Sequence, residues 1–101
     1  GNTSALRGKP DFVYFAPTKA AQRILAQALA RELGPKGVHV AYILVDAAID
    51  TPRTRPIFAA DKEDIFFCKP KDIASEIFHV GHQARSTWSF DVEIRPDIEV
   101  W

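Results

Sequence analysis

Several features that are common in proteins are scarce in this sequence. Its 101 residues contain no methionine and one cysteine, Cys68. No apolar run approaches the roughly 18 residues of a membrane-spanning helix. A single cysteine excludes a disulfide within the chain and fits a reducing compartment, so we expect a cytoplasmic protein that does not enter a membrane. The lack of methionine predicts a chain that is processed or is a piece of a longer protein.

An excess of charge of one sign is also lacking. The chain has 13 basic and 13 acidic residues, which gives a net charge of zero. This balance argues against a broad electrostatic interface with nucleic acid. With 47% apolar and 11% aromatic residues, the composition is that of a folded domain rather than a disordered segment.

The first half of the chain predicts a loop, a helix and a strand. Residues 1–13 are expected to form a loop. Pro17–Leu33 is expected to be helical, because apolar residues recur there at spacings of three and four. The apolar stripe comprises Ala21, Ile24, Leu25, Ala28 and Leu29. The residues expected mainly on the other side are Lys19, Gln22, Arg23, Gln27 and Arg31. Gly34 in a left-handed cap, followed by Pro35, is expected to end the helix.

Val38–Val45 follows and is apolar on both faces, as in a parallel strand covered by helices. Residues 46–68 predict a long excursion with a short helix around Ile57–Ala60. A second helix is expected from Pro70 to about His82. A half-buried edge strand is expected over Trp88–Ile94, with Pro96 ending it.

This order predicts an α/β fold with two main helices and two parallel strands joined by a right-handed crossover. Val38–Val45 looks central, yet the chain offers it one partner. Its other edge would expose unpaired backbone groups, so we expect further strands outside this chain.

The segment from Gly1 to Pro52 resembles the C-terminal half of a short-chain dehydrogenase/reductase. That family has a serine-bearing loop, a Tyr-x-x-x-Lys motif, and a long helix ending in Glu-Leu-Gly-Pro-x-Gly. A Val-x-Val strand and a Pro-Gly-x-Ile-x-Thr loop then follow. The matching stretches here are Lys19-Ala20-Ala21, the run from Ala30 to Val40, and Ile49-Asp50-Thr51-Pro52. The tail from Thr87 to Trp101 resembles a divergent branch with an acidic-aromatic Arg-Pro ending.

The resemblance implies a fold and an activity. Residues 1–101 would be the C-terminal part of one Rossmann-like, doubly wound, three-layer domain whose N-terminal dinucleotide-binding half is absent. The glycine-rich fingerprint for pyrophosphate is missing from this chain, so we expect the fragment alone to be inactive. The whole protein would transfer a hydride between NAD or NADP and an alcohol or carbonyl compound.

Site residues follow from the resemblance position by position. Lys19 would hold the nicotinamide ribose, and Ile49 and Thr51 would hold the carboxamide. The catalytic tyrosine position is occupied by Phe15, which has no proton to give. Tyr14 is adjacent, but a helix turns about 100° per residue, so Tyr14 would serve only if the helix starts later.

The serine position falls on Ala5, with Ser4 and Thr3 beside it, and Asp46-Ala47 replaces the Pro-Gly pair. Asp46 ends a buried strand, where α/β proteins bind ligands. The candidate catalytic residues are therefore Lys19, Ser4 and Tyr14. The candidate cofactor-binding residues are Lys19, Asp46, Ile49 and Thr51.

Simpler interpretations stand beside these. Ser4 can cap a turn, Thr51 can open the turn before Pro52, and Tyr14 can be a surface residue. His79 and His82 lie at a metal-binding spacing but lack a third ligand, so no metal site is expected.

Because Phe15 and Ala5 replace catalytic groups, the alternative is a non-catalytic Rossmann-fold protein kept for cofactor binding or assembly. The family resemblance also implies a homodimer or homotetramer formed through the long helix.

Overall fold

The computed structural model describes residues 1–58 and 60–101. The chain forms a mixed α/β structure whose elements are joined by loops. In chain order they are η1 (Thr3–Ala5), α1 (Phe15–Leu33), η2 (Gly34–Lys36), β1 (Tyr42–Val45), β2 (Ala48–Ile49), α2 (Thr54–Phe58), η3 (Asp64–Phe66), β3 (Phe67–Cys68), α3 (Pro70–Gly81), η4 (Arg85–Thr87) and β4 (Asp91–Ile94).

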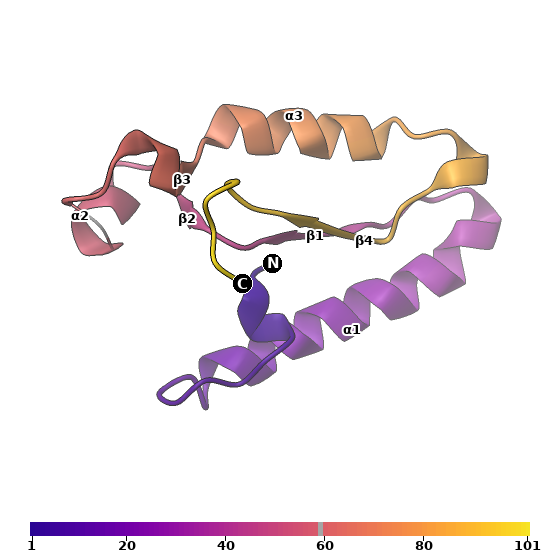
Figure 1. The fold of residues 1–101 in the computed structure, drawn as a ribbon. Helices are drawn as coiled ribbons and strands as arrows, with labels where there is room; N and C mark the ends of the chain where they lie inside the picture. Colours follow the sequence, from indigo (N-terminus) through magenta and orange to yellow (C-terminus); the bar gives the residue numbers. More distant parts are fainter. Residues whose placement is uncertain (59) are drawn as a thin grey trace.

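The centre of the molecule is a parallel pair of strands. β1 and β4 pair in parallel, with Tyr42 opposite Asp91 and Val45 opposite Ile94. Helix α3 lies on one side of this pair and α1 on the other (Figure 1). The predicted α/β class, with two main helices and parallel strands, is therefore confirmed.

Both strands are shorter than predicted. The segment expected over Val38–Val45 is a strand from Tyr42, and that expected over Trp88–Ile94 is a strand from Asp91. In the residues that precede β1 and β4, the two segments contact each other through a side chain rather than through strand pairing. The His39 ring stacks on Trp88 with centroids 4.7 Å apart, and its Nε2 lies 2.8 Å from the carbonyl oxygen of Ser89.

The second edge of β1 begins to pair with the start of the chain. The backbone N–H of Val45 donates to the carbonyl oxygen of Gly1 at 3.0 Å, and the amino group of Gly1 donates to that of Ile43 at 2.7 Å. Within residues 1–58 and 60–101, no strand continues this pairing. Among the described residues, Gly1 is therefore the one that pairs with this edge.

The long helix starts earlier and ends differently from the prediction. It begins at Phe15 rather than Pro17. Gly34 has helical backbone angles, and the left-handed residue is Gly37, with φ of 88°. The prediction of a left-handed Gly34 is wrong because a 3-10 turn, η2, extends the helix before the chain reverses.

The apolar stripe of α1 points away from the strands. Ile24 and Leu25 are 58% and 61% exposed, whereas Lys19, Arg23 and Gln27 are half-buried. Arg23 forms an ion pair with Asp91 of β4, its Nε lying 3.3 Å from Oδ1. This ion pair helps to fix the polar face of α1 against the sheet.

The excursion contains structure that the sequence did not predict. β2 and β3 form a second parallel pair, with Ala48 opposite Phe67 and Ile49 opposite Cys68. Its helix, α2, lies three residues earlier than expected. The predicted short helix around Ile57–Ala60 extends over residue 59, which lies outside the described residues.

Little of the chain is buried. Among the described residues, the buried apolar side chains are Ala16, Tyr42, Leu44, Phe67 and Val80, and the buried polar residue is Asp46. None of the helices in the described part of the chain is long and apolar enough to cross a membrane.

Candidate functional site

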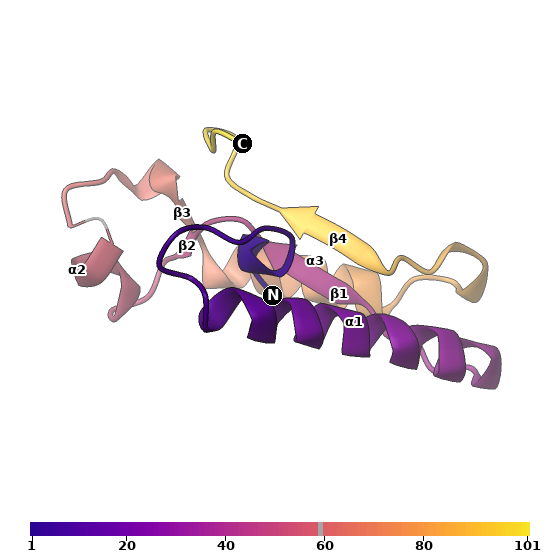
Figure 2. The same cartoon turned by 90° about the horizontal axis from the view of Figure 1, so that it is seen from below.

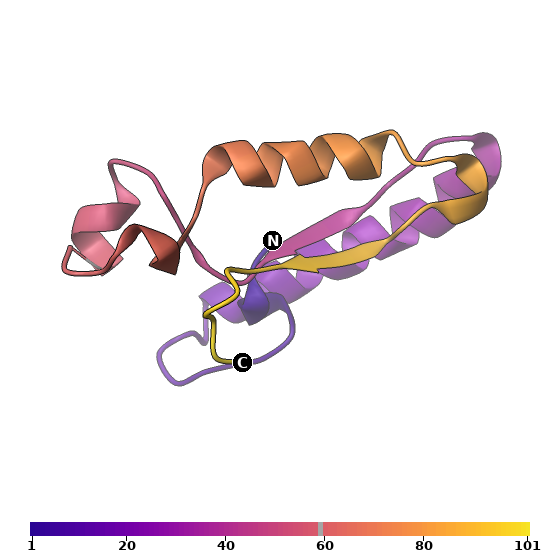
Figure 3. The ribbon, with the colours of Figure 1, turned by 45° about the horizontal axis from the view of Figure 1, so that its top comes forward.

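The carboxyl-terminal ends of β1 and β4 meet three irregular segments. The loop between η1 and α1, the excursion around α2 and the C-terminal tail all gather at this end of the molecule (Figures 2 and 3). A cleft of about 740 Å³ lies among them. It is lined by Asn2, Thr3, Ser4, Arg7, Lys9, Phe12, Phe15, Val45, Asp46, Ala47, Ala48, Ile49, Thr54, Phe58, Phe66 and Glu99.

Asp46 contributes a buried carboxylate to the cleft. It follows β1 directly and is 8% exposed. Its N–H donates to the carbonyl oxygen of Ile94 at 2.9 Å, which prolongs the β1–β4 pairing by one residue. Its Oδ2 lies 3.4 Å from Nε of Arg95. Because a buried carboxylate is unfavourable without a partner, Arg95 supplies the charge that Asp46 needs.

Arg95 itself is held by two further groups. Its guanidinium forms an ion pair with Glu93 and lies 3.9 Å from the ring centroid of Trp101. Sequence reasoning did not identify Arg95. The sequence did contain a signal for Arg95. Arg95 directly follows β4, just as Asp46 directly follows β1, and parallel pairing of the two strands brings these residues together.

Ser4 lies in the cleft, whereas Ala5 does not line it. Ser4 belongs to η1, which Asn2 caps by accepting the N–H of Ser4 on its Oδ1 at 3.1 Å. Phe15 lines the same cleft from the first turn of α1. Ser4 and Thr3, the hydroxyl-bearing residues beside the expected serine position, therefore both line the cleft.

Lys19 does not line the cleft, but it contacts Phe15, which does. It is half-buried, and its Nζ lies 5.3 Å from the centroid of the Phe15 ring. The pKa of the Gly1 amino group is lowered, first by burial and then by the charge of Lys19.

Tyr14 is not brought to the cleft. Its side chain is 89% exposed, and it precedes a helix that already begins at Phe15. The late helix start that a catalytic Tyr14 requires is therefore not present in the structure.

Ile49 and Thr51 are placed differently from each other. Ile49 lies in β2 and lines the cleft. Thr51 does not line it, and its Oγ1 accepts the N–H of Thr54 at 3.0 Å and lies 2.6 Å from Oγ1 of Thr54. The Thr51 hydroxyl is engaged at the start of α2, while Thr54 faces the cleft.

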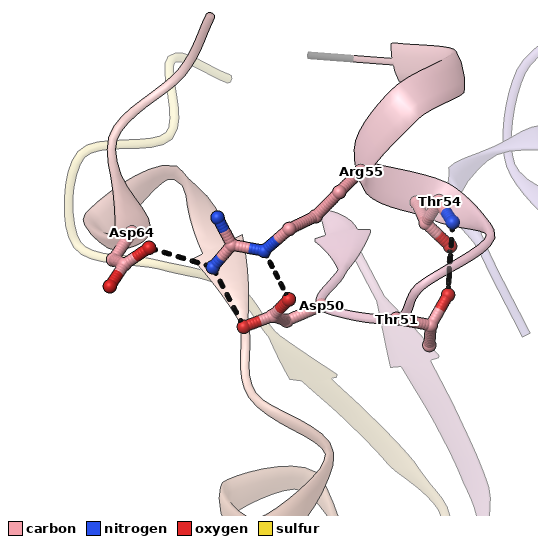
Figure 4. A network of polar contacts seen from close by, with 5 residues as sticks. All are labelled: Asp50, Thr51, Thr54, Arg55 and Asp64. Atoms are coloured by element: carbon pink, nitrogen blue, oxygen red, sulfur yellow. Dashed lines mark hydrogen bonds and ion pairs between the residues drawn. The ribbon is translucent and has the colours of Figure 1, made fainter. Parts of the chain in front are cut away.

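A clamp of three residues holds the excursion together, and it was also missed by sequence reasoning (Figure 4). The Arg55 guanidinium donates to both carboxylate oxygens of Asp50, at 2.5 and 2.9 Å, and to Oδ1 of Asp64 at 2.7 Å. The hydrogen bond from Arg55 lowers the pKa of Asp50, and the two carboxylates raise that of Arg55. Arg55 also lies over the Phe67 ring, 4.4 Å from its centroid.

A thiol site would depend on Cys68, and a metal site on a cluster of histidine, cysteine or acidic side chains. Burial, followed by the charges of Asp72 and Glu99, raises the pKa of the Cys68 thiol, which disfavours the nucleophilic thiolate. Within residues 1–58 and 60–101, no group of three or more histidine, cysteine or acidic side chains is arranged to hold a metal ion.

Comparison with known proteins gives this site a family context. No protein-family model matches the chain. A solved structure described as a short-chain dehydrogenase from Rhodopseudomonas palustris matches with a TM-score of 0.70 and 34% sequence identity. The match covers 95% of this chain and 35% of that structure, so the chain spans about a third of its length. This chain is therefore a Rossmann-like α/β fragment that is similar, over nearly its whole length, to a short-chain dehydrogenase.

Proposed function

We propose that the protein containing this chain is a nicotinamide-dependent oxidoreductase acting on an alcohol or carbonyl compound. The cleft at the carboxyl-terminal ends of the parallel strands carries this proposal, because it brings together Ser4, Asp46 and Ile49. Ligands of open α/β sheets bind at this edge. The cleft volume is in the usual range for small-molecule sites, about 300–1,000 Å³. The similarity to a short-chain dehydrogenase supports the reaction class.

The residues present fit part of a nicotinamide nucleotide. Ile49 lines the cleft beside Asp46, as a contact to the carboxamide end requires. The half-buried Lys19 ammonium can donate hydrogen bonds to ribose hydroxyls. The hydroxyls of Thr51 and Thr54 share one hydrogen bond at 2.6 Å, and of the two residues only Thr54 lines the cleft, so Thr54 is the nearer to a bound nucleotide. The choice between NAD and NADP rests on residues outside this chain.

A nicotinamide held by Lys19, Ile49 and Thr54 would supply the hydride chemistry that interconverts the alcohol and the carbonyl compound. The Ser4 hydroxyl orients the substrate oxygen by a hydrogen bond. Phe15 cannot exchange a proton, and its ring instead contacts the Lys19 ammonium. The Asp46 carboxylate, paired with Arg95, accepts the proton that leaves the alcohol oxygen on oxidation.

Turnover and nucleotide binding test the proposal. The intact protein should reduce NAD or NADP with a panel of alcohols, and should oxidise NADH or NADPH with aldehydes and ketones. Lys19→Ala should weaken nucleotide binding about tenfold, since a charged hydrogen bond to the ribose contributes roughly 1.5–3 kcal/mol. Lys71→Ala, on the exposed start of α3, is the matched control. Full nucleotide affinity in Lys19→Ala would contradict the role of this lysine.

A second candidate, a non-catalytic protein that binds the nucleotide, is favoured by one observation. Phe15 stands at the tyrosine position, and its ring lies in the cleft beside Lys19. Nucleotide binding without turnover of any alcohol or carbonyl compound would support this candidate over the first.

Self-association is proposed for the same protein. The stripe of Ile24, Leu25 and Leu29 on α1 is exposed, although apolar side chains gain free energy by burial. A homodimer or homotetramer that packs α1 against α1 of another copy would cover it.

A further inference from the structure

We infer that the cleft takes a substrate with an apolar, aromatic-sized body and an anionic group of the carboxylate type, held by Arg7 and Lys9. This inference names the substrate class of the proposed oxidoreductase site and rests on that function. Its two parts come from the two kinds of side chain that line the cleft.

The apolar part follows from four aromatic rings. Phe12 lines the cleft from the loop before α1, Phe15 from the first residue of α1, Phe58 from α2 and Phe66 from η3. Phe12 and Phe15 pack edge to face, with centroids 6.0 Å apart. Aromatic faces and edges bury flat apolar groups efficiently, so a ring-sized substrate body gains most here.

The anionic part follows from the charges. Arg7 and Lys9 both line the cleft from the loop between η1 and α1, and both are exposed. Neither takes part in any ion pair formed among residues 1–58 and 60–101. By contrast, the negative charge of Asp46 is already met by Arg95.

The same charges favour one orientation of the substrate. Arg7 lies three residues after Ser4, and both line the cleft. The carboxylates of Asp46 and Glu99 belong to the strand end and to the tail. The Asp46 charge is offset by Arg95, so an anionic group is attracted mainly to Arg7 and Lys9 and repelled mainly by Glu99, and it should point toward the loop rather than toward the tail.

A pair of alcohols that differ in one charge tests this inference. The probes are 4-(hydroxymethyl)benzoate and its neutral methyl ester, each assayed with NAD and with NADP on the intact protein. The acid should have the lower KM. In the Arg7→Gln/Lys9→Gln variant, KM for the acid should rise about tenfold with kcat unchanged, as expected for the loss of two partly exposed charge contacts. KM for the ester should not change.

Two controls separate charge from folding. The variant Arg7→Lys/Lys9→Arg keeps both charges and should retain the preference for the acid. Lys71→Gln removes an exposed charge from α3 and should change neither KM. Equal KM values for acid and ester, or an equal rise for both probes in Arg7→Gln/Lys9→Gln, would overturn the inference.

Direct binding distinguishes failure of this inference from failure of the proposed function. Saturation-transfer NMR measures the affinity of both alcohols, with and without the nucleotide, whether or not they are turned over. The anion site is supported if the acid binds more strongly than the ester and if this binding is lost in Arg7→Gln/Lys9→Gln. Such binding without turnover would contradict only the oxidoreductase assignment. Equal binding of the two alcohols, or no binding of either, overturns the anion site.

Discussion

At the scale of single residues, the Asp46 carboxylate depends on an arginine from another strand. A charged group that is 8% exposed is costly unless a counter-charge and hydrogen bonds accompany it. Arg95 supplies the counter-charge, and Trp101 covers the other face of the guanidinium at 3.9 Å. The cleft therefore holds a fixed negative charge whose position depends on both strand ends.

Removing Arg95 should destabilise the protein by leaving that charge alone. We expect Arg95→Ala to lower the free energy of unfolding by about 2 kcal/mol, somewhat less than the 3–5 kcal/mol typical of a broken, fully buried ion pair, because Arg95 remains partly exposed. Urea-induced unfolding followed by circular dichroism measures this. Asp46→Asn/Arg95→Ala should recover part of the loss, since it removes the uncompensated carboxylate. Equal losses in the single and double variants would show that the pair is not the cause.

What the sequence predicts at this scale depends on whether a residue acts alone. Asp46 is predictable because a residue that follows a buried parallel strand lies at the ligand-binding edge, and Ser4 because it stands next to the expected serine position. Arg95 is harder to predict, since its role depends on the strand register that places it beside Asp46. Tyr14 and Thr51 are assigned from the family resemblance, and a match of positions does not reveal that one is solvent-exposed and that the other accepts the N–H of Thr54 at the start of α2.

At the scale of elements, the Arg55 clamp joins β2, α2 and η3, and its strength should depend on pH. Hydrogen bonding to Arg55 lowers the pKa of Asp50 in the folded protein below the value of roughly 4 expected when unfolded. The ionised carboxylate therefore contributes stability above about pH 4 that is lost as the pH falls through the lower, folded pKa.

Comparison of the wild type with Asp50→Asn measures this contribution. The difference in urea midpoint should be constant from about pH 7 to pH 5 and should shrink as the pH falls below about 4. Asp61→Asn, in the same excursion and outside the clamp, should show no such trend. A difference for Asp50→Asn that persists undiminished in acid would rule out the ionised pair as its source.

The cap of α2 gives a second prediction for this element. Thr51→Ala removes the side-chain acceptor for the N–H of Thr54, which then keeps only the Thr51 carbonyl oxygen at 3.1 Å, and loss of such a side-chain cap costs about 1 kcal/mol. Backbone amides of α2 should then exchange with solvent about fivefold faster, while those of α3 should not change. Thr51→Ser should retain the slow exchange. Unaltered α2 protection in Thr51→Ala would mean that the hydroxyl does not stabilise the helix and is free for another role.

Helices and strands were predictable to different degrees. The periodicity of α1 and α3 identifies both helices, because each extends over several turns. It does not say which face of α1 meets the strands, and the Arg23–Asp91 pair helps to turn the polar face inward. β2 and β3 are two residues long each, so no alternation pattern exists to reveal them.

At the scale of the whole molecule, the chain is more extended than its length requires. Its radius of gyration is 15.2 Å, against about 13 Å for a compact domain of this size. The apolar stripe on α1 contributes to this poor burial, and β1 has a single residue paired along its second edge. More surface must therefore cover the chain before its apolar side chains are buried.

The stripe on α1 should be an assembly surface of the intact protein. Ile24→Glu/Leu25→Glu places two charges where apolar side chains are 58% and 61% exposed, so it should abolish self-association without unfolding the protomer. Light scattering after size-exclusion chromatography measures the mass, and a thermal melt by circular dichroism checks folding. Gln22→Glu adds a charge to an exposed position of the same helix and is the matched control. If the wild type is a monomer and the double variant loses its cooperative melt, another part of the same protein covers the stripe. An unchanged mass and an unchanged melt would show that nothing covers it.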